Sequence, residues 1–273
     1  MTNLLHSIVL ELAPTAPATL PRTMGHQAHA LLLALVQQVD PDLSAILHEG
    51  QAARPFTVSP LTGGRLRGEQ IVIPAGETCR LRFTLLDGGR IWACLSQQFL
   101  RGKLSVRLDN DHFTLLRTLA TPEPSGWAGY ADWQTLAATP ARRYLTLEFS
   151  SPTAFNRGDK LFHLLPDPKW VFESLARSWN IFAPAALHLD KQVIGEFAES
   201  QVVLADYELR TTTLHFPKYS QKGFSGRCTY QVRGEGECAE RLAMLAEFAR
   251  YSGVGYKTTM GMGQARLLPE RGA

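Results

Sequence analysis

The stretch Gly253-Val-Gly-Tyr-Lys-Thr-Thr-Met-Gly-Met-Gly263 carries four glycines in eleven residues. It separates a predicted helix, residues 238–251, from a predicted closing strand, residues 264–268. Glycine reaches positive φ without steric cost and leaves backbone N–H groups open to a ligand, because no Cβ intervenes. Successive amides of this kind form an anion-binding nest, and the lysine and two threonines add a charge and two hydroxyl groups. The loop is therefore predicted to hold a phosphate, with a plain helix cap and turn as the alternative.

Two other phosphate-binding motifs do not fit this loop. A Walker A loop needs a glycine directly before the lysine and a strand before the loop, whereas Lys257 follows Tyr256 and a helix comes first. A dinucleotide-binding fingerprint needs a strand followed by a helix, and here that order is reversed.

Outward from the loop, the rest of the chain gives two similar series of elements. The second half predicts a strand, a helix, a long hairpin around a turn at 218–223, a helix and a strand, at residues 144–149, 168–182, 202–216, 224–232, 238–251 and 264–268. The first half predicts, after a loop at 13–21, the same order with one added short helix, at residues 4–12, 25–39, 41–48, 54–61, 81–86, 90–100 and 104–119.

Each series has the order β-α-β-β-α-β, which is that of the ferredoxin-like, RRM-like fold. We therefore predict an α+β protein of two tandem ferredoxin-like domains. Residues 121–125, Thr-Pro-Glu-Pro-Ser, are the best linker, so the predicted domains are residues 1–125 and 126–273.

Composition limits the class of protein. The chain has 273 residues, 45% hydrophobic and 19% charged, which excludes an intrinsically disordered chain. The longest apolar run, residues 30–36, is far shorter than the ~20 residues of a membrane span. The N-terminus lacks a secretory pattern. We expect a cytoplasmic protein without membrane contact, and reduced, packed cysteines, because the four cysteines form no CxxC pair.

Positive charge is concentrated in two places, although the net charge is only +3. Residues 54–107 hold nine Lys or Arg against three Asp or Glu, and residues 209–234 hold five basic residues and no acidic one. Local clusters of this kind suit phosphate contacts. A solvated strand face is the alternative.

The glycine-rich stretch, followed by Gln264 and placed between the last helix and the last strand, resembles the C-terminal signature of the CRISPR-associated repeat-processing endoribonucleases. These belong to the RAMP superfamily of RNA-binding proteins. A second block agrees: Leu47-His-Glu-Gly50 and Arg54-Pro-Phe-Thr-Val-Ser-Pro-Leu61 resemble the family's N-terminal segment, where a histidine precedes a Phe-Thr-x-Ser strand. The resemblance covers most of the chain, but residues 62–140 carry no family motif.

The resemblance implies a metal-independent endoribonuclease that cleaves CRISPR precursor RNA within its repeats and so yields mature CRISPR RNA (crRNA) for antiviral defence. A 2′-hydroxyl attacks the adjacent phosphorus and leaves 2′,3′-cyclic phosphate and 5′-hydroxyl ends. The implied partner is repeat RNA, as precursor and as mature crRNA; effector-complex subunits and a second copy of the chain are further candidate partners. The sequence has no Asp/Glu/His cluster typical of a catalytic metal, and we expect no cofactor.

Histidines are the candidate acid and base, since the ordinary pKa of histidine is about 6.5. The resemblance points to His48. His26 and His29 share one face at a helix N-terminus, which disfavours the imidazolium and keeps a neutral base available. Some family members pair the histidine with a tyrosine and a lysine, but here the first tyrosine is residue 130 and the first lysine residue 103. Arg54 and Arg22 are the cations predicted to stabilise the transition state instead.

The predicted RNA-binding residues come from the matched strand, the basic hairpin and the loop: Ser59, Lys218, Lys222, Arg227, Gly253, Gly255, Lys257, Thr258, Thr259, Gly261 and Gly263. Ser59 has backbone pairing as its alternative role, and the loop residues have bracing as theirs.

Two alternative functions stay open. One is a non-catalytic RAMP-type subunit that holds crRNA in an effector complex. The other is a two-histidine phosphoesterase, which needs two H-x-[ST] motifs, whereas only His112-Phe-Thr114 qualifies.

Overall fold

The computed structural model describes residues 4–49, 53–87, 89–100, 104–216 and 218–269. Contacts divide the chain into a first unit, Met1–Tyr130 with Thr259–Gly261, and a second unit, Ala131–Thr258 with Met262–Ala273. The predicted linker at residues 121–125 lies inside the first unit. The first unit also includes three residues of the glycine-rich loop.

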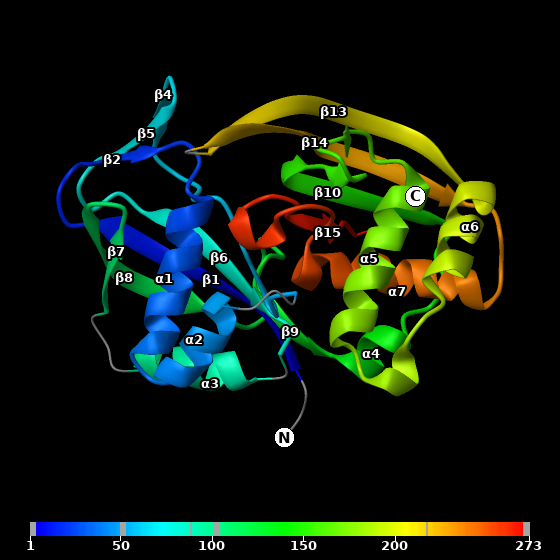
Figure 1. Ribbon diagram of the computed structural model, residues 1–273, viewed down its shortest axis with the longest axis horizontal. Helices are drawn as coiled ribbons and strands as arrows, with labels where there is room; N and C mark the ends of the chain where they lie inside the picture. Colours follow the sequence, from blue (N-terminus) through cyan, green and yellow to red (C-terminus); the bar gives the residue numbers. More distant parts are fainter. Residues whose placement is uncertain (1–3, 50–52, 88, 101–103, 217, 270–273) are drawn as a thin grey trace. The chain divides into compact units, whose positions relative to one another are not determined.

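Strand β1 (Leu4–Pro14) is central to the sheet of the first unit. Ile8, Leu10 and Leu12 lie on one face of this strand and belong to the buried core, together with residues of the helices that Figure 1 labels α1, α2 and α3. The sheet has the order β3-β6-β1-β8-β7, with β9 beside β1, and each strand along this order is antiparallel to its neighbours. The other main elements of this unit are α1 (Gly25–Gln37), α2 (Pro41–Glu49), β3 (Phe56–Val58), β6 (Cys79–Leu85), α3 (Arg90–Leu100), β7 (Ser105–Leu108), β8 (Asp111–Leu119) and β9 (Gly129–Asp132).

The second unit contains a four-stranded sheet of order β13-β14-β10-β15, and the burial of side chains alternates along β10, with Leu145, Leu147 and Phe149 buried. Its main elements are α4 (Trp133–Ala137), β10 (Tyr144–Thr153), β11 (Phe155–Asn156), β12 (Phe162–His163), α5 (Pro168–Phe182), α6 (Lys191–Gln201), β13 (Val202–Phe216), β14 (Tyr219–Val232), α7 (Glu237–Ser252) and β15 (Ala265–Leu267). The 3₁₀ helix η1 (Ala185–Leu187) also belongs to this unit. A second 3₁₀ helix, η2 (Thr258–Met260), lies in the glycine-rich loop, and its last two residues belong to the first unit.

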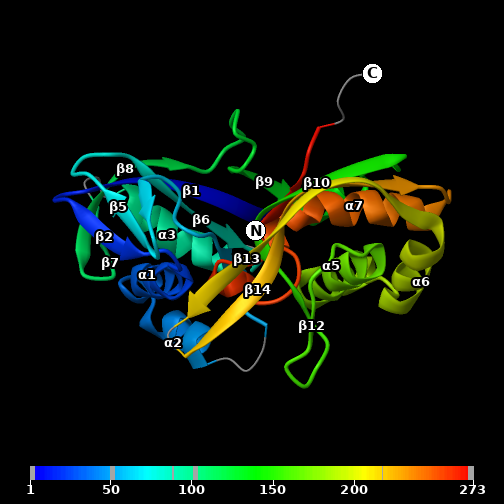
Figure 2. The ribbon, with the colours of Figure 1, turned by 90° about the horizontal axis from the view of Figure 1, so that it is seen from above.

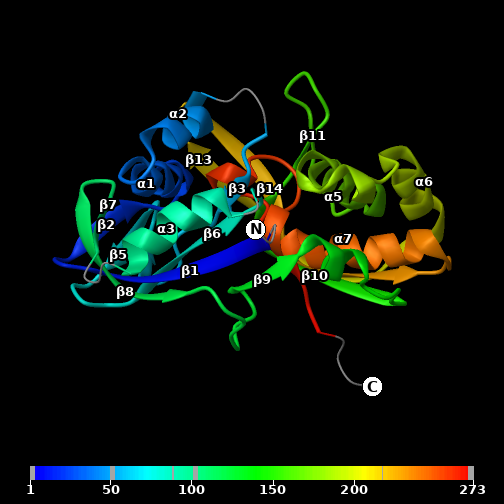
Figure 3. The same cartoon turned by 90° about the horizontal axis from the view of Figure 1, so that it is seen from below.

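Both units have the ferredoxin-like arrangement. Strands β1, β3, β6 and β8 take the spatial order 2-3-1-4, with helices after the first and the third strand. Strands β10, β13, β14 and β15 repeat that order. In the first unit the helices lie on one face of the sheet, as the views from above and from below both show (Figures 2 and 3). The predicted α+β fold with a duplicated ferredoxin-like unit is confirmed.

Two sequence predictions about single segments are wrong, and one helix was missed. The predicted loop at 13–21 contains strand β2 (Ala18–Pro21), which lies at the edge of a small sheet with β5 (Gln70–Ile73) and β4 (Arg65–Arg67). Pro21 is tolerated there because proline has no backbone N–H to donate, and an edge strand pairs with a neighbour on one side only. The predicted turn at 218–223 is largely strand β14, whose cross-strand pairing continues to Tyr219 opposite Phe216. Helix α6 was not predicted, although Asp190 marks its start by accepting from two helix amides.

The cysteines are packed in the way the sequence predicts. Cys79, Cys94 and Cys228 are buried, and Cys238 is half-buried. Burial raises the pKa of Cys79 to about 11 and that of Cys228 to about 12, so these thiols stay protonated at neutral pH. Within the described residues, no helix combines the length and the apolar character needed to cross a bilayer.

A charged row crosses the sheet of the second unit. Glu148 on β10 lies opposite Arg227 on β14 and Arg266 on β15. Its carboxylate accepts from both guanidinium groups, at 3.2 and 2.6 Å, and only 18% of the Glu148 side chain is exposed. A single carboxylate therefore separates two cations on the two strands that flank β10.

The first unit contains the same row at equivalent strands. Glu11 on β1 lies opposite Arg80 on β6 and Arg117 on β8, at 2.9 and 3.0 Å. In both units the acid stands on the first strand of the ferredoxin-like order and the arginines on the third and the fourth. The repeat therefore extends from the topology to individual side chains.

We predict that Glu148→Gln lowers the free energy of unfolding by about 1–2 kcal/mol, because the two arginines then face each other without a shared carboxylate. Denaturant titration of the purified chain measures this. Glu199→Gln is the matched control, since Glu199 pairs with Lys169 but is 60% exposed. Equal losses for the two variants would contradict the role assigned to the row.

Candidate functional site

The first turn of α1 carries two of the predicted histidines. Helix α1 begins at Gly25, and His26 and His29 follow one and four residues later. His26 is exposed, whereas His29 is only 8% exposed. The two side chains therefore share a helix end but differ in their access to a ligand.

His29 is held by a backbone carbonyl of the glycine-rich loop. Its Nδ1 lies 3.0 Å from the Thr259 carbonyl oxygen. Its ring packs against the Phe56 ring, with 5.1 Å between the two ring centroids. Because a carbonyl can only accept, Nδ1 donates and Nε2 is the acceptor nitrogen of the neutral ring. Burial lowers the pKa of His29 below 6.5, although the bond to Thr259 acts in the opposite direction. His29 is therefore neutral at pH 7.

Helix α2 places His48 in its last turn, where the side chain is exposed. Arg54 secures this helix end, since its Nε donates to the Leu47 carbonyl at 3.0 Å and its Nη2 donates to the His48 carbonyl at 3.2 Å. The charges of Arg54, His26 and His48 also contribute to lowering the pKa of His29. The structure thus brings these four predicted residues into one electrostatic neighbourhood.

The other two predicted residues of the first half have different surroundings. Arg22 lies between β2 and α1, and its amide donates to the Glu69 carbonyl. Ser59 lies just after β3; its hydroxyl accepts from the Arg82 amide and donates to the Pro60 carbonyl. Ser59 therefore pairs backbone groups, as its alternative interpretation expected.

The glycine-rich loop uses most of its amides inside the protein. The amides of Val254, Gly255 and Tyr256 donate to the Gly263 carbonyl, the Ser174 hydroxyl and the Ala154 carbonyl. The Gly263 amide donates to the Pro152 carbonyl. These four amides are consequently not open to an anion, and the prediction that they form an exposed anion-binding nest is wrong.

The glycines of this loop are required by its close packing. Gly253, Gly255, Gly261 and Gly263 all have positive φ, between +63° and +85°. A Cβ on Gly255 would lie 2.5 Å from the Ala154 oxygen, and one on Gly263 would lie 2.1 Å from the Val254 oxygen. The methyl group of Thr258 fills the space beside Gly253. Bracing, the alternative role of the loop, is thus the better account of these glycines.

The tip of the loop packs within the first unit. Residues Thr259–Gly261 belong to that unit, and the Met260 carbonyl lies where a Cβ on Gly25 would be, at 1.9 Å. Gly261, in turn, lies close to Gly25 and Pro60. The tip therefore contacts the start of α1, the same turn that carries His26 and His29.

Lys257 occupies an aromatic cluster in the second unit. Its ammonium donates to the Tyr219 hydroxyl and lies over the rings of Tyr219, Phe216 and Tyr256, at 4.1, 5.1 and 5.3 Å from their centroids. Burial lowers the pKa of Lys257, although the cation–π contacts keep a positive charge favourable there. Its backbone has φ of +57°, rare for a residue with a Cβ. This cation joins the loop to the end of the β13–β14 hairpin.

The basic hairpin residues fall into two groups. Lys218 and Lys222 are exposed, whereas Arg227 shares the Glu148 carboxylate with Arg266. The charge of Arg227 is thus partly balanced.

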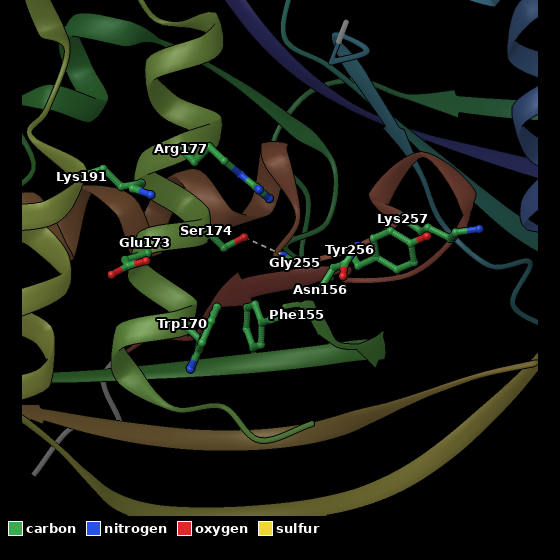
Figure 4. A pocket seen from close by; sticks show the side chains of 10 residues that line it. All are labelled: Phe155, Asn156, Trp170, Glu173, Ser174, Arg177, Lys191, Gly255, Tyr256 and Lys257. Carbon is green, nitrogen blue, oxygen red and sulfur yellow. Dashed lines mark hydrogen bonds between the residues drawn. The ribbon is translucent and has the colours of Figure 1, made fainter. Parts of the chain in front are cut away.

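Sequence reasoning missed a pocket of about 460 Å³ in the second unit, lined from β11, α5, α6 and the loop (Figure 4). Trp170, Ser174 and Arg177 line it from one face of α5. Their spacing of four and three residues on the predicted helix 168–182 is the signal that could have indicated it.

Comparison with protein families and solved structures gives one consistent result. Residues 4–138 match the model described as the CRISPR Cas6 N-terminal domain, and residues 147–265 match that of the CRISPR-associated endoribonuclease Cas6. The structure titled "Cas6 (TTHB231) product complex", a Thermus thermophilus protein, is 31% identical with a TM-score of 0.82 and covers 97% of this chain and 100% of its own. That titled "Cas6 (TTHA0078) substrate mimic complex" is 28% identical, with a TM-score of 0.74 and coverage of 98% and 100%.

Curated relatives agree over shorter segments. A Mycobacterium tuberculosis CRISPR-associated endoribonuclease Cas6 is 35% identical over 133 residues, 48% of this chain and 41% of the relative. A Streptococcus thermophilus protein with the same description is 25% identical over 124 residues, 45% of this chain and 50% of the relative. The matched segments thus span half or less of these two relatives.

We predict that His29→Gln reduces the loss of stability on acidification. The lowered pKa of His29 means that the unfolded chain takes up this proton first as pH falls below 6.5. Stability from this group is therefore complete above pH 6.5 and is lost as pH falls toward the lower pKa of the folded state. The free energy of unfolding, measured at pH 7.5 and 5.5, should fall less in the variant. An equal fall would show that His29 is not held neutral.

We predict that Gly255→Ala destabilises the chain by about 1–3 kcal/mol more than Gly236→Ala does. Both glycines have φ of +82°, but a Cβ on Gly236 meets nothing within 4 Å. The difference therefore isolates the clash with Ala154, and thermal or denaturant unfolding of the two variants measures it. Matching stabilities would contradict the bracing role.

Proposed function

The chain belongs to the Cas6 family of CRISPR-associated endoribonucleases, and we propose from this that it cleaves CRISPR precursor RNA within its repeats to yield crRNA. The observation that carries the proposal is that His26, His48 and Arg54 lie near enough to His29 for their charges to lower its pKa. Two of the similar Cas6 structures are a product complex and a substrate mimic complex, which supports a substrate-binding role for this fold.

The proposed chemistry is an internal transesterification. One imidazole takes the proton of the 2′-hydroxyl, whose oxygen attacks the adjacent phosphorus. The bond from phosphorus to the 5′-oxygen breaks, and a second imidazole gives that oxygen a proton. The products are a 2′,3′-cyclic phosphate and a 5′-hydroxyl. No electron donor or acceptor takes part, and two histidines supply both proton transfers, so the proposed reaction is metal-independent.

Exposure separates the roles of the three histidines. His48 and His26 are exposed, so they are proposed as the catalytic pair. His29 is buried and bonded to Thr259, so we assign it a positioning role that holds the loop tip beside the pair. Arg54 keeps further N–H donors beyond its two carbonyl contacts, and these are proposed to stabilise charge on the phosphorane. Arg22 is the second candidate for that role.

The RNA-binding surface is proposed to include the exposed ammonium groups of Lys218 and Lys222 on the hairpin. Thr259 at the loop tip is proposed to contact the backbone of the RNA near the histidines, and Thr258, the preceding residue, is a further proposed RNA contact. Arg227 should contribute less, because Glu148 already balances it. We propose three further partners of the chain: mature crRNA, effector-complex subunits and a second copy of the chain. The proposed location is the cytoplasm.

One observation favours the alternative of a non-catalytic crRNA-binding subunit. The first 129 residues hold no tyrosine, and the first lysine is residue 103, so the tyrosine and lysine that accompany the histidine in some family members are missing. Incubating repeat RNA with the purified chain in EDTA distinguishes the two functions. Cleavage with cyclic-phosphate ends supports the nuclease, and binding without cleavage supports the subunit.

We predict that His48→Ala lowers the single-turnover cleavage rate at least about 100-fold, because a general acid or base typically contributes 10²–10⁴. Affinity for the uncleaved RNA should stay near that of the wild type, since one imidazole is a small part of the proposed RNA-binding surface. Gel-based cleavage in EDTA and filter binding measure the two quantities.

His112→Ala is the matched control, because His112 is an exposed histidine of the same unit on β8. It should cleave as the wild type does. A wild-type rate for His48→Ala would remove His48 from the mechanism.

A further inference from the structure

The pocket of the second unit lies between three elements that carry different chemistry (Figure 4). Helix α5 contributes Trp170, Glu173 and Arg177, the start of α6 contributes Lys191, and the loop contributes Tyr256. Its volume of about 460 Å³ is within the range of small-molecule sites. The Ser174 hydroxyl accepts from the Gly255 amide and so fixes the loop to the pocket wall.

One side of the pocket is aromatic. Phe155 and Trp170 lie together, 6.3 Å between centroids, on the side opposite Arg177 and Lys191 in Figure 4. Tyr256 closes the end of the pocket and packs on Phe162 at 5.2 Å. Trp170 and Tyr256 are half-buried and both line the pocket. His163 stacks on Trp170 at 5.6 Å and the Arg157 guanidinium lies over the same ring, so these two groups hold the Trp170 ring at the pocket wall.

The other side of the pocket is charged and without internal ion pairs. Among the described residues, neither Arg177 nor Lys191 has an acidic partner within salt-bridge distance, and Glu173 has no basic partner within that distance. The N-terminus of α6 is not itself the anion site, because its first amides donate to the Asp190 carboxylate. Two cations and one carboxylate therefore face the pocket with their charges available.

This combination selects for a nucleotide. An apolar ligand would leave the three charges desolvated and unpaired. A free anion would make no use of the aromatic wall. A nucleotide satisfies both sides, because its base packs on aromatic rings and its phosphate accepts from arginine and lysine. A carboxylate such as that of Glu173 can also accept from an exocyclic amino group of a base.

We propose that this pocket holds one unstacked nucleotide of the RNA substrate, with its base against Trp170 and Tyr256 and its phosphate bound by Arg177 and Lys191. The inference rests on the proposed function, since it assumes that RNA binds this chain. It adds a binding site remote in sequence from the histidines, and it assigns that site to base capture rather than to cleavage.

Arg177→Gln tests the site without disturbing the core, because the Arg177 side chain is exposed. The variant should bind repeat RNA about ten-fold more weakly, the effect of one charged hydrogen bond. Lys169→Gln is the matched control: it removes the same charge from the same helix, but Lys169 pairs with Glu199 and does not line the pocket. The control should bind as the wild type does. Equal affinities for Arg177→Gln and Lys169→Gln would overturn the proposal.

An abasic scan of the repeat RNA identifies the captured nucleotide. At one unpaired position, loss of the base should weaken binding to the wild-type chain about ten-fold. The same loss should matter much less in Arg177→Gln, because base and phosphate contacts of one nucleotide are coupled. Independent effects at every position would overturn the proposal.

Two arms separate the sources of failure. If the wild-type chain cleaves repeat RNA and the scan shows no coupling, the pocket assignment alone is wrong; if it neither binds nor cleaves that RNA, the proposed function fails with it. Titration with nucleoside monophosphates tests a free ligand. Saturable binding that Arg177→Gln abolishes, without coupling in the scan, would also overturn the assignment to RNA.

Discussion

The contact between the loop tip, Thr259–Gly261, and the first turn of α1 is the constraint on which the site depends. Nδ1 of His29 donates to the Thr259 carbonyl, and the Met260 carbonyl lies where any side chain on Gly25 would have to be. Both contacts need a loop that turns sharply, which explains the positive φ of Gly261. A segment distant in sequence thereby becomes part of the first unit, beside its histidines.

This constraint also sets the electrostatics of the site. His29 loses its access to water and is held neutral, so the positive charge nearby is left to Arg54. Arg54 in turn satisfies the last carbonyls of α2 and fixes the helix end that presents His48. The site thus contains the buried imidazole of His29, the guanidinium of Arg54 and the exposed imidazoles of His26 and His48. That set of groups suits proton transfer at a phosphodiester.

The sequence predicts those parts of the structure that depend on local pattern. The alternation in β10 and the proline-led start of α5 fix those elements, and the glycines of the loop identify where the chain must approach itself closely. Short edge strands such as β2 were missed, because pairing with β5 and not local pattern decides them. The separation of His29 from His26 was likewise hidden, since three-residue spacing places both on one helix face while burial depends on the loop that packs over one of them.

The most direct test of the central claim is the single-turnover cleavage rate of Gly25→Ala. Alanine favours a helix over glycine by up to about 1 kcal/mol, so the substitution by itself should not weaken α1. Its methyl group, however, would collide with the Met260 carbonyl and displace the loop tip. We predict a folded protein whose cleavage of repeat RNA falls about 100-fold, the cost of a misplacement of about 1 Å. A folded variant that cleaves at the wild-type rate would contradict it.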